Sequence, residues 1–207
     1  MLKAVSHSKN EDSKSVTVYY NNEAAVDWYK KYEHLDILYI IGVRIIAEVM
    51  ESQVQVKQAR ILDVAAGTGL TGIEVTKLGF ENIDALEPSE EMLKKLPRNV
   101  YKNIYKEALD PVKQSSIPNN SYDCLVSTGS VLEGHIEGAH FSEFVRILKP
   151  GGLIIFNVSD RYSDFRERLE DDLQALMEDG SLESVTKQRS VYFYNFEDAN
   201  IYTIRTA

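Results

Sequence analysis

The sequence predicts an α/β protein built on one mainly parallel sheet with helices on both faces. From residue 60 onward, short apolar segments typical of strands alternate with segments of helical periodicity. This pattern favours a parallel sheet that is covered on both sides. The first apolar segment runs into a glycine-rich turn, ILDVAAGTGLTG at residues 61–72, the natural ligand-binding position of such a sheet. The 207 residues, 43% of them hydrophobic, can bury a full core and fit a single domain.

The alternation can be followed element by element. Strands are predicted at residues 60–64, 82–86, 101–106, 122–127 and 153–158, and helices at residues 71–78, 89–96 and 141–148. Residues 163–179 place apolar side chains on one face and acids on the other, which predicts an amphipathic helix that Gly180 ends. Two last strands, at 184–194 and 200–206, are close enough to pair as a hairpin around residues 196–198.

The N-terminal part of the chain has the pattern of a tail followed by a helical cap. Residues 1–15 are polar and charged without periodicity, which predicts a mobile tail. Residues 24–50 carry apolar side chains near helical spacing, with Gly42 as a possible break, and are expected to pack on the main body. We therefore expect one domain at residues 16–207, divided into a helical cap at 16–58 and a sheet core at 59–207.

Charge and composition exclude several classes of function. The net charge of −9 repels phosphate backbones, which disfavours a nucleic-acid partner. The longest uncharged apolar stretch, residues 37–43, is too short to span a bilayer, so no membrane partner is expected. The single cysteine, Cys124, cannot form an internal disulfide, which suits the cytoplasm. The four histidines are not spaced like metal ligands, and no metal site is expected. The sequence gives no indication of the oligomeric state.

The glycine-rich turn contains a literal G-x-G-x-x-G at residues 67–72, which suggests a nicotinamide or flavin oxidoreductase. A dinucleotide turn needs its first glycine directly after the strand, however. If the strand ends at Val64, the three glycine positions fall on Ala65, Gly67 and Leu70. Asp63, at the end of the strand, would also repel a pyrophosphate. An acid at this position suits a cationic or neutral polar ligand group better.

Several segments resemble the motifs of class I S-adenosylmethionine-dependent methyltransferases. DVAAGTG at residues 63–69 resembles motif I, an acid followed by Gly-x-Gly-x-Gly, with Ala65 in place of the first glycine. Further matches follow in order: LEPSEEML at 86–93, YKEA at 105–108, IPNNSYD at 117–123 and LKPGG at 148–152. Asp27-Trp28, Tyr32-Glu33, STGS at 127–130 and EGH at 133–135 are similar, more narrowly, to the Williams-Beuren-region methyltransferase-like proteins of animals, a likeness that implies no known substrate.

This resemblance implies a Rossmann-like seven-stranded sheet ordered 3-2-1-4-5-7-6, with the last strand antiparallel, and S-adenosylmethionine as the cofactor, with S-adenosylhomocysteine as the product. Glu87 is implied to accept hydrogen bonds from both ribose hydroxyls, and Glu107 with the next backbone N–H to read the adenine. The implied cofactor-binding residues are Asp63, Ala65, Gly67, Gly69, Glu87, Pro88, Met92, Glu107, Ala108 and Ser127. Of the N-terminal tyrosines, Tyr32 is expected to point its hydroxyl at the cofactor, with Tyr20 and Tyr29 as alternatives.

Several of these residues also have a purely structural interpretation. Asp63 could cap the following turn, Glu87 could favour a helix start through its charge, and Met92 could be core packing. Asp110 could serve in place of Glu107.

Methyl transfer is an in-line displacement, so the protein mainly aligns the reactants and excludes water. His135, in the loop after the fourth strand, is the candidate catalytic base because its imidazole titrates near neutral pH. The expected lid is formed by the N-terminal helix and residues 129–139. A small-molecule acceptor is favoured and a protein acceptor stays open. The alternatives are an NAD(P)-dependent oxidoreductase and a non-catalytic methyltransferase-fold partner subunit, for which Ala65 is the only lost cofactor residue.

Overall fold

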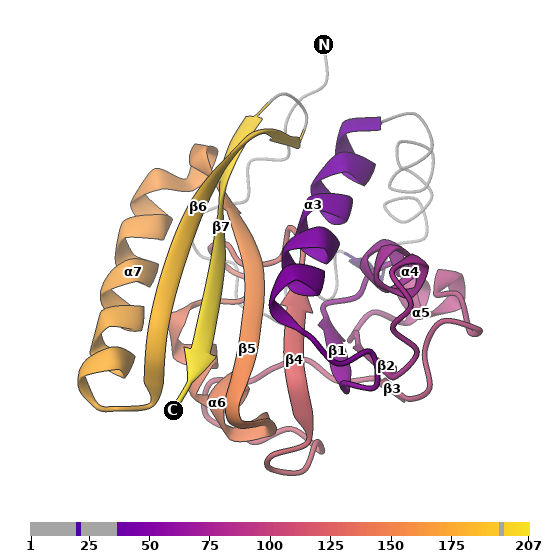
Figure 1. Ribbon diagram of the computed structural model, residues 1–207, viewed down its shortest axis with the longest axis horizontal. Helices are drawn as coiled ribbons and strands as arrows, with labels where there is room; N and C mark the ends of the chain where they lie inside the picture. The colour runs from indigo at the N-terminus through magenta and orange to yellow at the C-terminus, as the bar shows by residue number, and fades with distance from the viewer. Residues whose placement is uncertain (1–19, 22–36, 195–196) are drawn as a thin grey trace.

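The computed structural model describes residues 20–21, 37–194 and 197–207 (Figure 1). The predicted tail at residues 1–15 and the predicted lid residues of the N-terminal helix, including Tyr32, lie outside the described residues. Every structural statement below concerns the described part of the chain. Within it, no helix has the length and apolar character needed to cross a membrane.

One seven-stranded sheet organises the molecule. Its strands are β1 (Ile61–Val64), β2 (Ile83–Leu86), β3 (Ile104–Tyr105), β4 (Tyr122–Ser127), β5 (Leu148–Ser159), β6 (Leu182–Tyr194) and β7 (Glu197–Thr206). Their order is β3-β2-β1-β4-β5-β7-β6, with the first five parallel and β7 antiparallel to both of its neighbours. The predicted strand order and the antiparallel last strand are confirmed.

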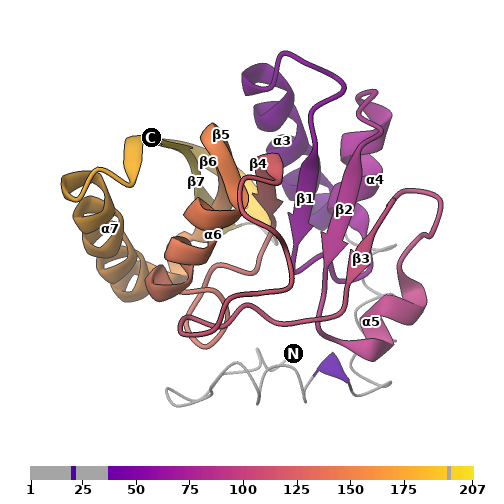
Figure 2. The same cartoon turned by 90° about the horizontal axis from the view of Figure 1, so that it is seen from below.

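Helices cover both faces of the sheet. They are α3 (Ile37–Gln53), α4 (Leu70–Lys77), α5 (Glu90–Lys95), α6 (Phe141–Ile147) and α7 (Ser163–Glu178), with short 3-10 turns η1 (Gly138–His140) and η2 (Asp160–Tyr162). Figure 2 shows α6 and α7 on one side of the sheet and α3 and α4 on the other. Adjacent strand residues point to opposite faces, so Leu62 joins the core under α6 and α7, whereas Ile61 joins the core under α3 and α4.

Several boundaries differ from the sequence-based expectation, and β3 covers only Ile104–Tyr105 instead of residues 101–106. Helix α3 continues through Gly42, because the burial of Val43, Ile46, Ala47 and Met50 outweighs the helix penalty of one glycine. Strand β5 begins at Leu148 instead of residue 153.

The LKPGG segment at 148–152, which precedes the strand predicted at 153–158, lies within β5 as an irregular, bulge-like stretch. The register on β4 shifts between the Tyr122–Leu148 and Cys124–Leu153 pairs, and Gly151 has a φ of 73°. Strand β7 begins at Glu197, so Glu197 and Asp198 belong to the strand and not to the turn, since the ladder already pairs Glu197 with Tyr194.

Candidate active site

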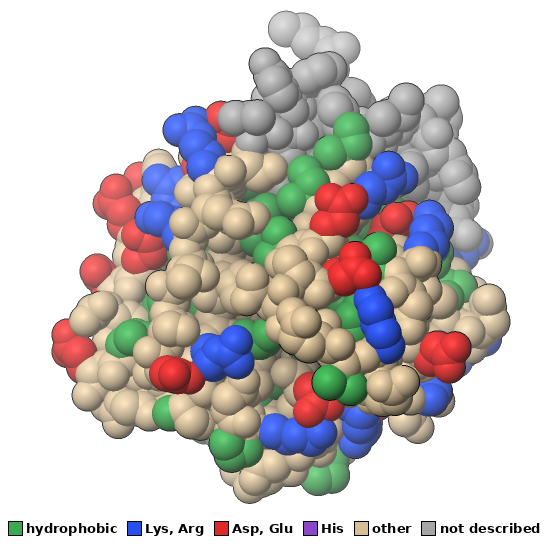
Figure 3. All heavy atoms as spheres, in the orientation of Figure 1, with side chains coloured by type: hydrophobic (Ala, Val, Ile, Leu, Met, Phe, Trp, Pro, Cys, Tyr) green, Lys and Arg blue, Asp and Glu red, His purple; other side chains and the backbone are tan. Residues whose placement is uncertain are grey.

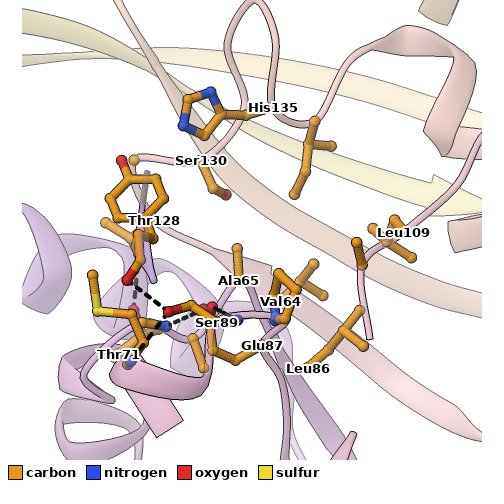
Figure 4. A pocket seen from close by; sticks show the side chains of 18 of the residues that line it. Val64, Ala65, Thr71, Leu86, Glu87, Ser89, Leu109, Thr128, Ser130 and His135 are labelled. Atoms are coloured by element: carbon orange, nitrogen blue, oxygen red, sulfur yellow. Dashed lines mark hydrogen bonds between the residues drawn. The ribbon is translucent and has the colours of Figure 1, made fainter. Parts of the chain in front are cut away.

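A pocket opens at the carboxyl ends of β1, β2, β3 and β4. The sheet order reverses between β1 and β4, and α/β proteins of this kind bind their ligands at such a reversal. The wall combines the loop after β1, the start of α5, the turn after β3 and the loop between β4 and α6. Figure 4 shows side chains from these segments facing one space.

The loop after β1 has the frame that the sequence predicts. β1 ends at Val64, and Ala65 and Gly67 line the pocket with φ values of 54° and 57°. An alanine in the left-handed region is uncommon, which explains why the motif carries a glycine where this chain has Ala65. Gly69 does not line the pocket. It precedes α4, and a Cβ placed on it would lie 2.6 Å from Pro97 Cδ.

Asp63 lies beneath this loop and outside the pocket lining. Its Oδ2 atom accepts hydrogen bonds from the Gly72 backbone N–H at 3.1 Å and from the Tyr101 hydroxyl at 2.6 Å. Burial raises the pKa of Asp63 to about 7, with the charge of Glu87 adding to the effect and the two hydrogen bonds opposing it. The Asp63 carboxyl group thus links the start of α4 to Tyr101 through two hydrogen bonds.

Glu87 joins the loop after β1 to the start of α5. Its Oε2 atom accepts the Gly67 N–H at 2.8 Å, and its Oε1 atom accepts the Ser89 N–H at 2.8 Å. The residue is only 5% exposed, and burial raises the pKa of its carboxyl group. Each carboxylate oxygen can accept a second hydrogen bond. Glu87 therefore offers acceptor capacity to the pocket, where Pro88 and Met92 form the adjacent wall.

The turn after β3 contributes Glu107 and Ala108 to the lining. The Glu107 carboxylate also accepts hydrogen bonds from the Ser116 backbone N–H at 3.1 Å and from its hydroxyl at 2.6 Å. Asp110 is outside the lining and accepts the backbone N–H groups of Val112 and Lys113. Of the two acids that the sequence left open, Glu107 is the one that borders the pocket.

Ser127, at the end of β4, lies behind the pocket wall. Its hydroxyl donates to the Val64 carbonyl at 2.8 Å, so in its short contact with Ser130 the donor must be Ser130. Ser130 lines the pocket and consequently presents acceptor lone pairs to it. Ser127 itself holds β4 and β1 together and is not in the lining.

His135 lines the pocket from the loop between β4 and α6, and its ring meets the Tyr20 ring edge-on, with centroids 5.9 Å apart. Tyr20 is also in the lining, and its carbonyl accepts the Ser89 hydroxyl at 2.8 Å. The Asn21 side chain accepts the Glu90 N–H at 2.8 Å. These hydrogen bonds hold the segment at residues 20–21 against the start of α5, while the Tyr20 ring contacts His135.

The sequence-predicted residues therefore divide into three groups. Those that line the pocket are Ala65, Gly67, Glu87, Pro88, Met92, Glu107, Ala108 and His135. Asp63, Gly69 and Ser127 lie behind the lining, and Tyr32 is outside the described residues. Sequence reasoning gave no role to His140, which also lines the pocket. Its only sequence signal was its position at the end of the loop that carries His135.

Comparison with known proteins agrees with this geometry. Residues 61–152 match the family model described as "Methyltransferase domain". Methyltransferase-like protein 27 of Homo sapiens is 28% identical over 132 residues, which cover 61% of this chain and 52% of that protein. The chain thus matches about half the length of this curated relative.

Two solved structures show the same fold. A methyltransferase from Thermotoga maritima, described as a possible histamine N-methyltransferase, has a TM-score of 0.62 at 16% identity, with 91% of this chain and 98% of that chain covered. Magnesium protoporphyrin IX methyltransferase from Synechocystis, with bound S-adenosylhomocysteine, has a TM-score of 0.70 at 13% identity, with 95% and 100% covered.

Residues 61–152 therefore belong to the methyltransferase domain family, and the chain has the class I methyltransferase fold. S-adenosylmethionine is the methyl donor of proteins of this class.

Proposed function

We propose that this protein transfers the methyl group of S-adenosylmethionine to a small-molecule acceptor. The observation that carries the proposal is the buried Glu87 carboxylate, which borders the pocket while the Gly67 and Ser89 N–H groups fix it in place. A fixed carboxylate with acceptor capacity at the end of β2 suits a pair of ribose hydroxyls. The Glu87 carboxylate borders the pocket that several segments of the methyltransferase domain at residues 61–152 form together.

The cofactor would lie along the loop after β1, with its ribose on Glu87. The backbone of Ala65 and Gly67 would pass close to its amino-acid part, while Pro88 and Met92 would form the apolar wall. Glu107 and the Ala108 N–H would face the adenine. Asp63 and Ser127 would hold the loop from behind, through their contacts with Gly72, Tyr101 and Val64. Gly69 would contribute through its N–H, which donates to the Ala66 carbonyl at 2.8 Å.

The chemistry requires little covalent work from the protein. Bound S-adenosylmethionine supplies a methyl group that its sulfonium already activates, so alignment and exclusion of water dominate catalysis. A base is needed only for a nucleophile that starts protonated. His135 would take that proton, because its imidazole lies at the pocket wall beside Tyr20.

A small molecule is the favoured acceptor because the described pocket is concave and partly covered by Tyr20. A protein segment remains the alternative acceptor. Acidic and basic side chains alternate over the face shown in Figure 3 without forming one basic surface on that face, in keeping with an acceptor other than nucleic acid. We place the reaction in the cytoplasm, since the chain's only cysteine, Cys124, is a buried free thiol.

Isotopic labelling tests the activity and the acceptor class together. The protein is incubated with methyl-labelled S-adenosylmethionine and a cell extract, which is then separated by a small mass cutoff. We expect label in the small-molecule fraction with the wild type and a large loss of that label with Glu87→Ala. Label confined to macromolecules would refute the small-molecule acceptor. Label no higher than in extract alone would contradict catalysis and favour a non-catalytic partner subunit.

A further inference from the structure

His140 is a buried polar residue of the pocket that the proposed chemistry does not use. It ends η1, directly before α6, and is 7% exposed. Because it lines the pocket, the little surface that it exposes lies at the ligand site. A side chain buried to this degree needs partners for its polar atoms, since an unmatched donor costs free energy.

The hydrogen bonds of His140 determine which ring nitrogen carries the proton. The Glu137 N–H donates to Nδ1 at 3.1 Å, and the structure gives that N–H no other acceptor among the described residues. The Glu137 carbonyl also lies 3.2 Å from Nδ1, but it already has a donor in the His140 backbone N–H at 2.9 Å, whereas the Glu137 N–H would lose its acceptor if Nδ1 carried the proton. Nδ1 is therefore the acceptor. Burial lowers the pKa of His140, so the neutral ring carries its proton on Nε2.

The Nε2–H group faces the pocket. It has no hydrogen-bond partner among the described residues, whereas every fully buried side-chain nitrogen and oxygen in that part of the chain has one. Nε2 is consequently not sealed inside the core and reaches the accessible surface. Since that surface is the pocket, the ring presents a donor, and not a base, to a bound molecule.

The position of His140 indicates which part of a ligand it meets. The Ser115 backbone N–H and hydroxyl donate to the Glu143 carboxylate on α6, at 2.9 Å and 2.6 Å. The start of α6, with His140 directly before it, thus lies near the segment that follows β3, where Ala108 and Leu109 also line the pocket. Figure 4 shows Leu109 apart from His135 in the pocket.

We propose that His140 is a cofactor-specificity residue whose Nε2–H donates to a ring nitrogen of the adenine. This inference rests on the proposed function, because it assumes that the adenine lies along the turn after β3. Purine ring nitrogens that do not carry a proton are acceptors, so they match the single donor that the ring offers. The inference adds a side-chain contact from the loop between β4 and α6 to the contacts expected from Glu107 and Ala108.

Calorimetry with S-adenosylhomocysteine and with its 1-deaza, 3-deaza and 7-deaza analogues tests this contact. His140→Phe keeps an aromatic ring and removes the donor, and we expect its affinity for S-adenosylhomocysteine to fall by about two- to tenfold, the usual effect of one neutral hydrogen bond. One deaza analogue should bind the wild type more weakly than the parent compound but lose that difference in His140→Phe. Ser142→Ala, at an exposed position on α6, is the matched control and should bind like the wild type.

Unchanged affinity in His140→Phe, or equal deaza penalties in both proteins, would overturn the inference. If the variant does not fold, the wild type alone still tests the inference. Equal affinity of the wild type for the parent compound and all three analogues would exclude a hydrogen bond to an adenine ring nitrogen. A wild type that does not bind S-adenosylhomocysteine at all would instead overturn the proposed function.

Discussion

The Oε2 atom of Glu87 accepts the backbone N–H of Gly67 at 2.8 Å, although the two residues lie 20 positions apart. This bond ties the end of β2 to the loop after β1. Since Oε1 is held by Ser89 N–H at the same distance, the carboxylate is oriented before any ligand arrives. Preorganisation of this kind lowers the entropy cost of binding.

Replacing Glu87 should weaken binding of S-adenosylhomocysteine more than it weakens the fold. Glu87→Ala removes the ribose partner and leaves two N–H groups without their acceptor, so we expect a loss of roughly 1.5–3 kcal/mol in binding free energy by calorimetry. Glu90→Ala is the matched control, because Glu90 is an exposed acid outside the pocket lining. An unchanged dissociation constant in Glu87→Ala would remove this residue from the site.

Gly67→Val should abolish cofactor binding while the fold survives. Gly67 has a φ of 57°, and the nearest atom to an added Cβ is the Ala65 carbonyl oxygen at 4.0 Å, so the new side chain has room in the protein but strains the backbone. Gly79→Val is a close control, because Gly79 has a φ of 86°, open space around it and no place in the lining. Both variants should keep a native circular dichroism spectrum, and only Gly79→Val should bind. Binding by Gly67→Val would mean that the loop merely starts a helix.

The buried acid Asp63 predicts a pH-dependent stability difference. Its pKa is raised from 3.8 to about 7 in the folded protein, so between these values the native state holds more protons than the unfolded state. The stability that this group contributes is complete below pH 3.8 and is lost as the pH rises through 7.

Asp63→Asn can still accept both hydrogen bonds on one oxygen, as Asp63 Oδ2 does. We expect the variant to be at least as stable as the wild type at pH 8, with its relative advantage shrinking towards pH 5. Urea unfolding at several pH values measures this trend. A constant stability difference across that range would contradict the assigned pKa.

Gly72→Ala should destabilise the protein rather than affect the ligand directly. A Cβ on Gly72 would collide with the Tyr101 ring and hydroxyl, with Tyr101 Cε1 only 2.7 Å away. The hydroxyl would have to leave Asp63, so we expect a clear fall in the midpoint of thermal unfolding. A midpoint equal to that of the wild type would show that Tyr101 moves without cost.

The order of the sheet was predictable because alternating strands and helices restrict the topology and the motifs recur in chain order. The roles of single side chains were less predictable from the sequence. Asp63 carries the acid of the motif, yet its placement beneath the loop depends on Tyr101, which lies 38 residues away. The role that we propose for His140 depends on a ring tautomer that Glu137 fixes and on the place of its ring in the pocket, which the residue type alone does not show. Likewise, the bulge at Gly151 depends on pairing with β4, and a turn-like sequence cannot show it.

Calorimetric titration of the wild type with S-adenosylhomocysteine and, separately, with NADH tests the central claim most directly. The pocket geometry and the methyltransferase domain predict saturable binding of S-adenosylhomocysteine, with a matching rise in the thermal unfolding midpoint, and no such response to NADH. Saturable binding of NADH together with no response to S-adenosylhomocysteine would contradict the account and favour an oxidoreductase.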